Sequence, residues 1–243
     1  MIALIKKEIG SFLSSFTGYI VIVVFLVING LFMWVFPGEL NIPDSGYATL
    51  DTLFIIAPWV FLFLVPAVTM RLFAEEKRSG TMELLLVRPL TDLQIVMAKY
   101  TSAILLVLIS LIPTLVYYWS VYTLGNPPGN LDAGAIWGSY TGLFFLGSCY
   151  AAIGIFSSSL TENQIVAFIL AVLLSFFFFT GFEMISALPL PYRAEELLLY
   201  LGINEHYSSI SRGVIDTRDI VYFVSLIAFF IFLTRTVLQS RKW

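Results

Sequence analysis

Six long stretches without a charged residue dominate this sequence of 243 residues. A helix that crosses about 30 Å of hydrocarbon needs roughly 20 apolar residues, with a range of about 17–25. Five stretches meet this length directly, and the sixth meets it if Arg235 extends its side chain to the interface, which lengthens the span to Leu238. The stretches are Tyr19–Phe36, Phe54–Met70, Ala103–Leu124, Ala135–Phe156, Ile165–Phe182 and Ile220–Thr234.

These stretches predict an all-α integral membrane protein with six transmembrane helices. The whole chain, residues 1–243, is expected to form one transmembrane domain, with a long loop over 73–99 and another over 186–219. Such a fold leaves no room for a large soluble domain. The expected spans cover about 19–36, 54–72, 100–124, 135–157, 165–185 and 220–238.

The composition agrees with a membrane protein and excludes several classes of function. Only 12% of the residues are charged, about half the usual share in a soluble domain. The net charge of −3 offers no basic surface for nucleic acid. One cysteine, Cys149, and one histidine, His206, can form neither an internal disulfide nor a metal site with several histidines. The chain is therefore expected to bind no cofactor and no metal of its own.

The basic residues predict the orientation of the chain. If the six spans alternate from a cytoplasmic N-terminus, ten of the 13 Lys and Arg residues lie on the cytoplasmic side. Only Arg193, Arg212 and Arg218 lie outside. Because cytoplasmic loops carry an excess of basic residues, both termini are predicted to be cytoplasmic, in the inner membrane.

Two segments outside the spans leave alternatives open. Residues Met1–Phe12 carry apolar residues at helical spacing, which favours an amphipathic helix in the interface over a simple lead-in to the first span. The outer stretch Ser186–Asp219 is apolar in its first half. It forms a surface helix, caps the bundle from outside, or dips back into the outer leaflet as a helical hairpin, where protein must cover its backbone.

The loop between the second and third spans contains a small structural unit. Ser79-Gly80 interrupts the chain, Thr81 can cap a short helix over Met82–Arg88, and Pro89 ends that helix. Thr91-x-x-Gln94 is a capping box, which predicts the start of the next helix. The leucines of the short helix either pack under the spans or dock into a groove on a cytoplasmic partner.

This loop resembles the signature of ABC-2-type transporter permeases. The resemblance is carried by the run Glu75–Leu85, by Arg88-Pro89 and by Lys99 at the entry of the third span. It implies an ABC-2, type V exporter-like fold in which the loop forms a coupling helix seated on a separate ATPase subunit. The residues that would contact this subunit are Glu75, Glu76, Gly80, Thr81, Glu83, Leu84, Leu85, Arg88 and Pro89.

The sequence contains no phosphate-binding loop of the form Gly-x-x-x-x-Gly-Lys-Ser/Thr, so the chain is not expected to be an enzyme. The resemblance places ATP and Mg²⁺ in the partner ATPase. It also implies a second permease subunit, either a different chain or a copy of this one.

A narrower resemblance points to one branch of the family. His206-Tyr207, Ile210–Asp216 and Arg218-Asp219 resemble the outer segment of gliding-motility permeases, which are related to copper-processing permeases. The function implied is that of a permease subunit in a gliding-motility transporter. The alternative is a component of a motility or secretion machine that anchors or moves other proteins without transporting a substrate.

The fourth span carries small residues four positions apart, at Gly138, Gly142, Gly147 and Ala151. Such spacing lets two helix backbones approach closely in lipid. These residues are predicted to pack against other helices of the chain, with a seam between two copies as the alternative.

Overall fold

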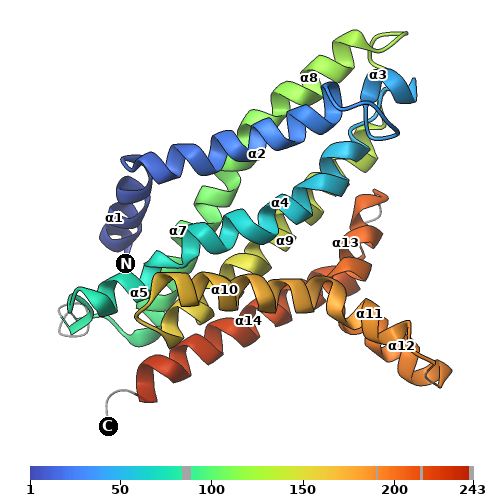
Figure 1. Ribbon diagram of the computed structural model, residues 1–243. Coiled ribbons are helices and arrows are strands. Elements are labelled where there is room, and N and C mark those ends of the chain that lie inside the picture. The colour runs from blue at the N-terminus through green and yellow to red at the C-terminus, as the bar shows by residue number, and fades with distance from the viewer. Residues whose placement is uncertain (84–88, 190, 214–215, 241–243) are drawn as a thin grey trace.

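The computed structural model describes residues 1–83, 89–189, 191–213 and 216–240, and every regular element in these ranges is helical (Figure 1). Short helices join or extend the long ones. The elements are α1 (Ile2–Leu13), α2 (Phe16–Trp34), α3 (Ile42–Ser45), α4 (Asp51–Thr69), α5 (Arg71–Arg78), α7 (Asp92–Leu111), η1 (Ile112–Thr114), α8 (Leu115–Leu124), α9 (Ala133–Leu160), α10 (Gln164–Phe176), η2 (Phe177–Gly181), α11 (Phe182–Ser186), α12 (Tyr192–Leu201), α13 (Ile203–Ser211) and α14 (Thr217–Ser240).

The predicted fold class is confirmed. Five helical segments of the described chain are long and apolar enough to cross a membrane: α4 with α5, α7 to α8, α9, α10 to α11, and α14. Helices α1 and α2 meet at an angle of 64°, and they add a sixth span if the bent pair is counted as one. This bend separates a short N-terminal helix from the apolar run, as the amphipathic pattern of Met1–Phe12 predicts. The chain is thus a multi-pass membrane protein with up to six spans.

Helix α9 is the centre of the bundle. It contacts α4, α7, α10, α13 and α14, and 78% of its most apolar stretch of 18 residues is buried inside the protein. Helices surrounded by lipid gain little from removing apolar surface from water. Close packing therefore supplies much of the association between them. Helix α9 thus lies between α4 and α14 and contacts both.

Small residues allow the neighbours of α9 to approach it. A Cβ atom on Gly138 would lie 2.9 Å from the Cα of Gly213, at the end of α13, and one on Gly147 would lie 2.7 Å from Val107 of α7. A Cβ on Gly142 would meet Ile210 at 3.3 Å, and Ala151 is fully buried. The small-residue face is therefore occupied by helices of the same chain.

The two halves of the outer stretch behave differently. Helix α12 projects from the bundle (Figure 1), and its Leu197 is 67% exposed. Helix α13 packs against α9 and α14, and the hydroxyl of its Tyr207 donates a hydrogen bond to the carbonyl of Phe54 at 2.7 Å. Helix α13 thus covers this end of the bundle, whereas α12 lies on the surface.

A buried pair attaches α13 to α14. His206 Nδ1 lies 2.7 Å from Asp219 Oδ1, and His206 Nε2 lies 2.9 Å from the carbonyl oxygen of Tyr200. The imidazole stacks on Tyr222, with ring centroids 3.9 Å apart. In the first turn of α14, the backbone N–H of Arg218 donates to the side chain of Asp216, and this hydrogen bond lowers the pKa of the Asp216 carboxyl. These contacts fix α13 against the start of α14.

Candidate functional site

The predicted coupling loop leaves the bundle through α5. This helix follows α4 with almost no interruption and ends at a turn in which Gly80 has φ of +70°, a conformation that favours glycine. Ser79 and Thr81 exchange a hydrogen bond through their hydroxyls at 2.8 Å. The turn reverses the chain at the break that Ser79-Gly80 predicts.

The loop returns to the bundle at the start of α7, where the predicted capping box lies. The backbone N–H of Gln94 donates to Thr91 Oγ1 at 3.3 Å, and the N–H of Thr91 donates to Gln94 Oε1 at 3.0 Å. Both hydrogen bonds satisfy N–H groups that have no partner inside α7. This element of the prediction is confirmed by the structure.

A cluster of four charges lies where α5 and α7 meet α1. Lys99 Nζ lies 2.8 Å from Glu76 Oε2 and 3.0 Å from Glu8 Oε1. Lys7 Nζ lies 2.9 Å from Glu76 Oε1 and 3.4 Å from Glu8 Oε1. We call Lys7, Glu8, Glu76 and Lys99 the charge cluster. Its two cations and two anions balance, and they join three helices.

Lys99 is the buried member that holds the charge cluster together. Its side chain has no exposed surface, its Nζ also donates to the carbonyl of Leu72, and it lies 5.0 Å from the centre of the Phe73 ring. A buried ammonium group is tolerated only where such partners replace its hydration. The site of Lys99 is therefore built around a charge, not around an apolar side chain.

The end of α9 provides a second attachment for α5. Ser158 Oγ accepts hydrogen bonds from the backbone N–H groups of Phe73 and Ala74, each at 3.0 Å, and donates to the carbonyl of Met70 at 2.8 Å. These N–H groups lie in the first turn of α5, where a helix has no partners for them. Lys77 Nζ also donates to the carbonyl of Ser159. A serine from a distant helix thus caps α5.

The predicted contact residues fall into three groups. Glu75, Gly80, Thr81, Glu83 and Pro89 are exposed, as contact with a partner requires. Glu76 is only 7% exposed because it belongs to the charge cluster, so its carboxylate serves a contact within the chain. Leu84, Leu85 and Arg88 lie outside the described residues.

The sequence analysis did not identify Glu8 and Ser158 as parts of this site. Glu8 belongs to the charged face of the N-terminal amphipathic segment, a pattern that shows a polar side but not what the side meets. Ser158 is one of three consecutive serines at the end of α9, all of them fully buried. Three consecutive serines at the end of an apolar run are the sequence pattern that could have indicated a polar contact.

A larger cavity lies at the opposite end of the bundle. It has a volume of about 730 Å³ between α4, α9, η2 and α13. Its wall mixes aromatic with charged groups, including Trp59, Tyr207, Asp51, Glu183 and Arg212. The two ends of the bundle therefore differ. Ion pairs and hydrogen bonds connect α5 to its neighbours at one end, and an open cavity lies at the other.

One comparison with known proteins identifies the family. A family model described as ABC-2 family transporter protein matches residues 38–201, about two thirds of the chain. No curated protein matches the sequence. The matched range includes α4, α5, the loop that follows, α7 and the central helix α9, whereas α1, which contributes Lys7 and Glu8 to the site, lies outside it. The chain therefore belongs to the ABC-2 transporter family, as a multi-pass membrane component and not as the ATPase.

Proposed function

We propose that this chain is a permease subunit driven by a separate ABC ATPase subunit, which would bind ATP and Mg²⁺. Members of the ABC-2 family generally work with such a partner. The observation that supports the proposal is the combination of an exposed turn at Gly80 and Thr81 with a rigid attachment directly behind it. A contact made on the turn would reach the spans through that attachment.

The charge cluster and Ser158 distribute a displacement of α5 among four helices. Helix α5 follows α4 directly, and Glu76 joins it to α7 through Lys99. Glu8 extends the connection to α1, and Ser158 extends it to α9. Because packed helices rearrange as units and not by continuous deformation, an ATPase that pushes on the loop would move these helices together. The cavity at the far end of α4 and α9 is where such a movement would open or close a route.

Glu83 tests the proposed contact with the ATPase. We expect Glu83→Lys to weaken co-purification of the ATPase and its stimulated hydrolysis, because the substitution reverses a charge at an interface. The thermal stability of the permease alone should change little, since Glu83 is exposed and lies outside every span. Leu85→Asp should have the same effect.

Glu162→Lys is the matched control. Glu162 is an exposed carboxylate in the short connection between α9 and α10, which the orientation proposed below places on the same side of the membrane. It should leave the ATPase bound. Normal binding by both Glu83→Lys and Leu85→Asp would contradict a coupling role for this loop.

We propose further that the chain lies in the inner membrane with both termini in the cytoplasm, as the distribution of its basic residues indicates. Single cysteines at Ser79 and Asn130, in a Cys149→Ser background, should react with an impermeant thiol reagent from opposite sides. Both positions are exposed, so a reagent on the same side of the membrane can reach them. Labelling of Ser79→Cys from outside intact cells would show that the orientation is wrong.

We also propose that the transporter belongs to the gliding-motility branch and contains a second permease subunit. The support is the resemblance of the outer segment, in which His206 and Asp219 form the buried pair that joins α13 to α14. Affinity purification of the tagged chain from its own cells should recover one ATPase and one further permease. Recovery of the tagged chain as the sole permease would favour a pair of identical subunits.

A further inference from the structure

A cavity of about 290 Å³ adjoins the charge cluster between α1 and α5. About half of its wall is polar, and this half includes Ser11 on α1, Arg71 and Glu75 on α5, and the hydroxyls of Ser79 and Thr81 in the turn. Three of the four charge-cluster residues also line it, namely Lys7, Glu8 and Glu76. The cavity lies where the spanning part of α4 gives way to the water-soluble loop, which is the depth of lipid headgroups.

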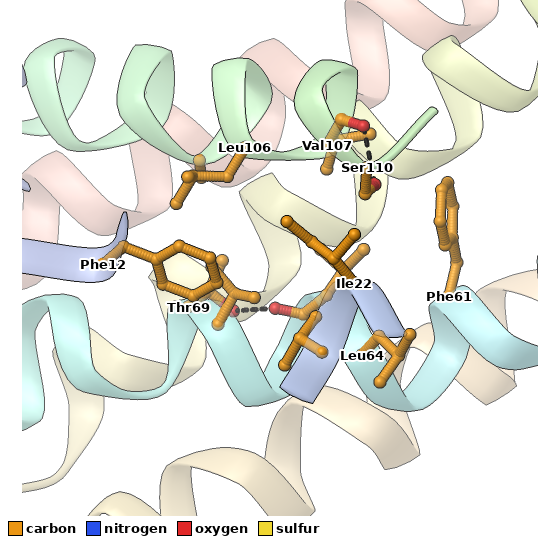
Figure 2. A pocket seen from close by; sticks show the side chains of 12 residues that line it. Phe12, Ile22, Phe61, Leu64, Thr69, Leu106, Val107 and Ser110 are labelled. Carbon is orange, nitrogen blue, oxygen red and sulfur yellow. Dashed lines mark hydrogen bonds between the residues drawn. The ribbon is translucent and has the colours of Figure 1, made fainter. Parts of the chain in front are cut away.

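The polar cavity continues into an apolar groove between α2, α4 and α7. The two share Phe12, Val68 and Leu106 in their walls. Figure 2 shows the side chain of Phe12 reaching toward Thr69 of α4, with Leu106 above it on α7. The groove is narrow, with a volume of about 20 Å³, and its wall also includes Ile22, Leu64 and Phe61.

The few hydroxyls in the groove are already used. Thr69 Oγ1 donates to the carbonyl of Val65 at 3.0 Å, and Ser110 Oγ donates to the carbonyl of Val107 at 2.7 Å. The rest of the wall is hydrocarbon. A polar cavity at headgroup depth joined to an apolar groove inside the bundle has the composition of a phospholipid, with a charged head and an acyl chain.

The charges in the cavity specify which headgroup fits. The charge cluster is neutral by itself, which leaves Arg71 and Glu75 as one further cation and one further anion in the wall. Neither has an ion-pair partner among the described residues, although they lie one turn apart on α5. A cation and an anion that do not neutralise each other complement a zwitterion.

The order of the groups along the helix sets the polarity of that zwitterion. Val68, Arg71 and Glu75 follow one another away from the groove, and Glu75 lies about 6 Å beyond Arg71 at a rise of about 1.5 Å per residue. In a phospholipid the acyl chain is followed by the phosphate, and in an ethanolamine lipid the ammonium group comes last. Arginine presents a planar fork that suits phosphate, and a carboxylate suits an ammonium group.

We propose that this site binds one phosphatidylethanolamine molecule. Its phosphate pairs with Arg71, its ammonium group pairs with Glu75, and the first carbons of one acyl chain enter the groove lined by Phe12, Val68 and Leu106. The lipid seals the angle between α1 and α2 against α4. The inference does not depend on an ATPase partner, because every group that it uses belongs to this chain and to the lipid.

The test measures lipid binding to the purified full chain by native mass spectrometry after exchange into detergent. Phosphatidylethanolamine should bind severalfold more tightly than phosphatidylglycerol, which lacks the ammonium group. Arg71→Gln should weaken binding of both lipids about tenfold, because it removes a charged hydrogen bond to phosphate. Glu75→Gln should weaken only phosphatidylethanolamine and abolish the preference.

Arg78→Gln is the control, because Arg78 is an exposed arginine of the same helix that does not line the cavity. It should change neither affinity, and melting temperatures close to that of the original chain would show that the variants are folded. Free phosphoethanolamine should compete far less well than the lipid, since it cannot use the groove. Equal binding of the two lipids, a preference that survives Glu75→Gln, or competition by phosphoethanolamine at the concentration of the lipid would each overturn the proposal.

Discussion

Replacing Lys99 with methionine is expected to lower the free energy of unfolding by about 3–5 kcal/mol. The Lys99 ammonium group balances two carboxylates, those of Glu8 and Glu76, which it meets at 3.0 and 2.8 Å. Methionine would fill much of the same volume but would leave these carboxylates with Lys7 alone. Lys7 is partly exposed, so it cannot balance both acids inside the protein.

Unfolding in a denaturing detergent, followed by circular dichroism, would measure this loss. Lys6→Met is the control, because Lys6 is an exposed lysine of α1 outside the charge cluster. The double variant Lys99→Met, Glu76→Gln should be more stable than Lys99→Met alone, since it removes one of the two acids that lost their partner. A double variant less stable than the single one would contradict the proposed balance of charges.

The second large effect is expected at Gly154, where α9 crosses α4. Gly154→Ala should destabilise the protein by about 1–3 kcal/mol, as overpacking of a close contact does. A Cβ atom at this position would overlap the side chain of Thr69, which is fully buried and whose Cβ would lie only 2.8 Å away. The two helices would have to move apart along a contact that forms the middle of the bundle.

Gly10→Ala on α1 is the control, because it makes the same change where no close contact exists. A Cβ atom on Gly10 meets nothing within 4 Å, so the better helix propensity of alanine should stabilise that variant by about 0.5–1 kcal/mol. Thermal melting of both variants should therefore shift in opposite directions. Thr69→Gly should restore part of the stability of Gly154→Ala, and a failure to do so would show that the contact does not limit packing there.

Local patterns of the sequence predict most of the fold. The length of an apolar run decides whether a helix can span a membrane, and the runs at Phe54–Met70 and Ala135–Phe156 lie within α4 to α5 and α9. The capping box at Thr91 and Gln94 and the break at Gly80 are equally local, because they depend on neighbours within four residues. Such features form wherever these residues occur, so no knowledge of the tertiary structure is needed.

The candidate site is less predictable, as Glu75 and Glu76 illustrate. They are adjacent carboxylates in the same signature, yet Glu75 is exposed and Glu76 is buried beside Lys99. Consecutive residues on a helix point about 100° apart, since 3.6 residues complete a turn. Which side of α5 meets the charge cluster depends on where α1 and α7 lie. The sequence of α5 contains no information on the positions of these two helices.

The sequence by itself determined the helical class, the spans and the turn that exposes the loop, because all three arise from the chemistry of neighbouring residues. The tertiary structure alone decided which polar groups meet inside the protein. Glu8 lies 91 positions from Lys99, and Ser158 lies 85 positions from Phe73, yet these pairs connect α5 to the rest of the bundle. Contacts over such separations form only when distant helices pack, and close packing depends on the shape of every side chain between them.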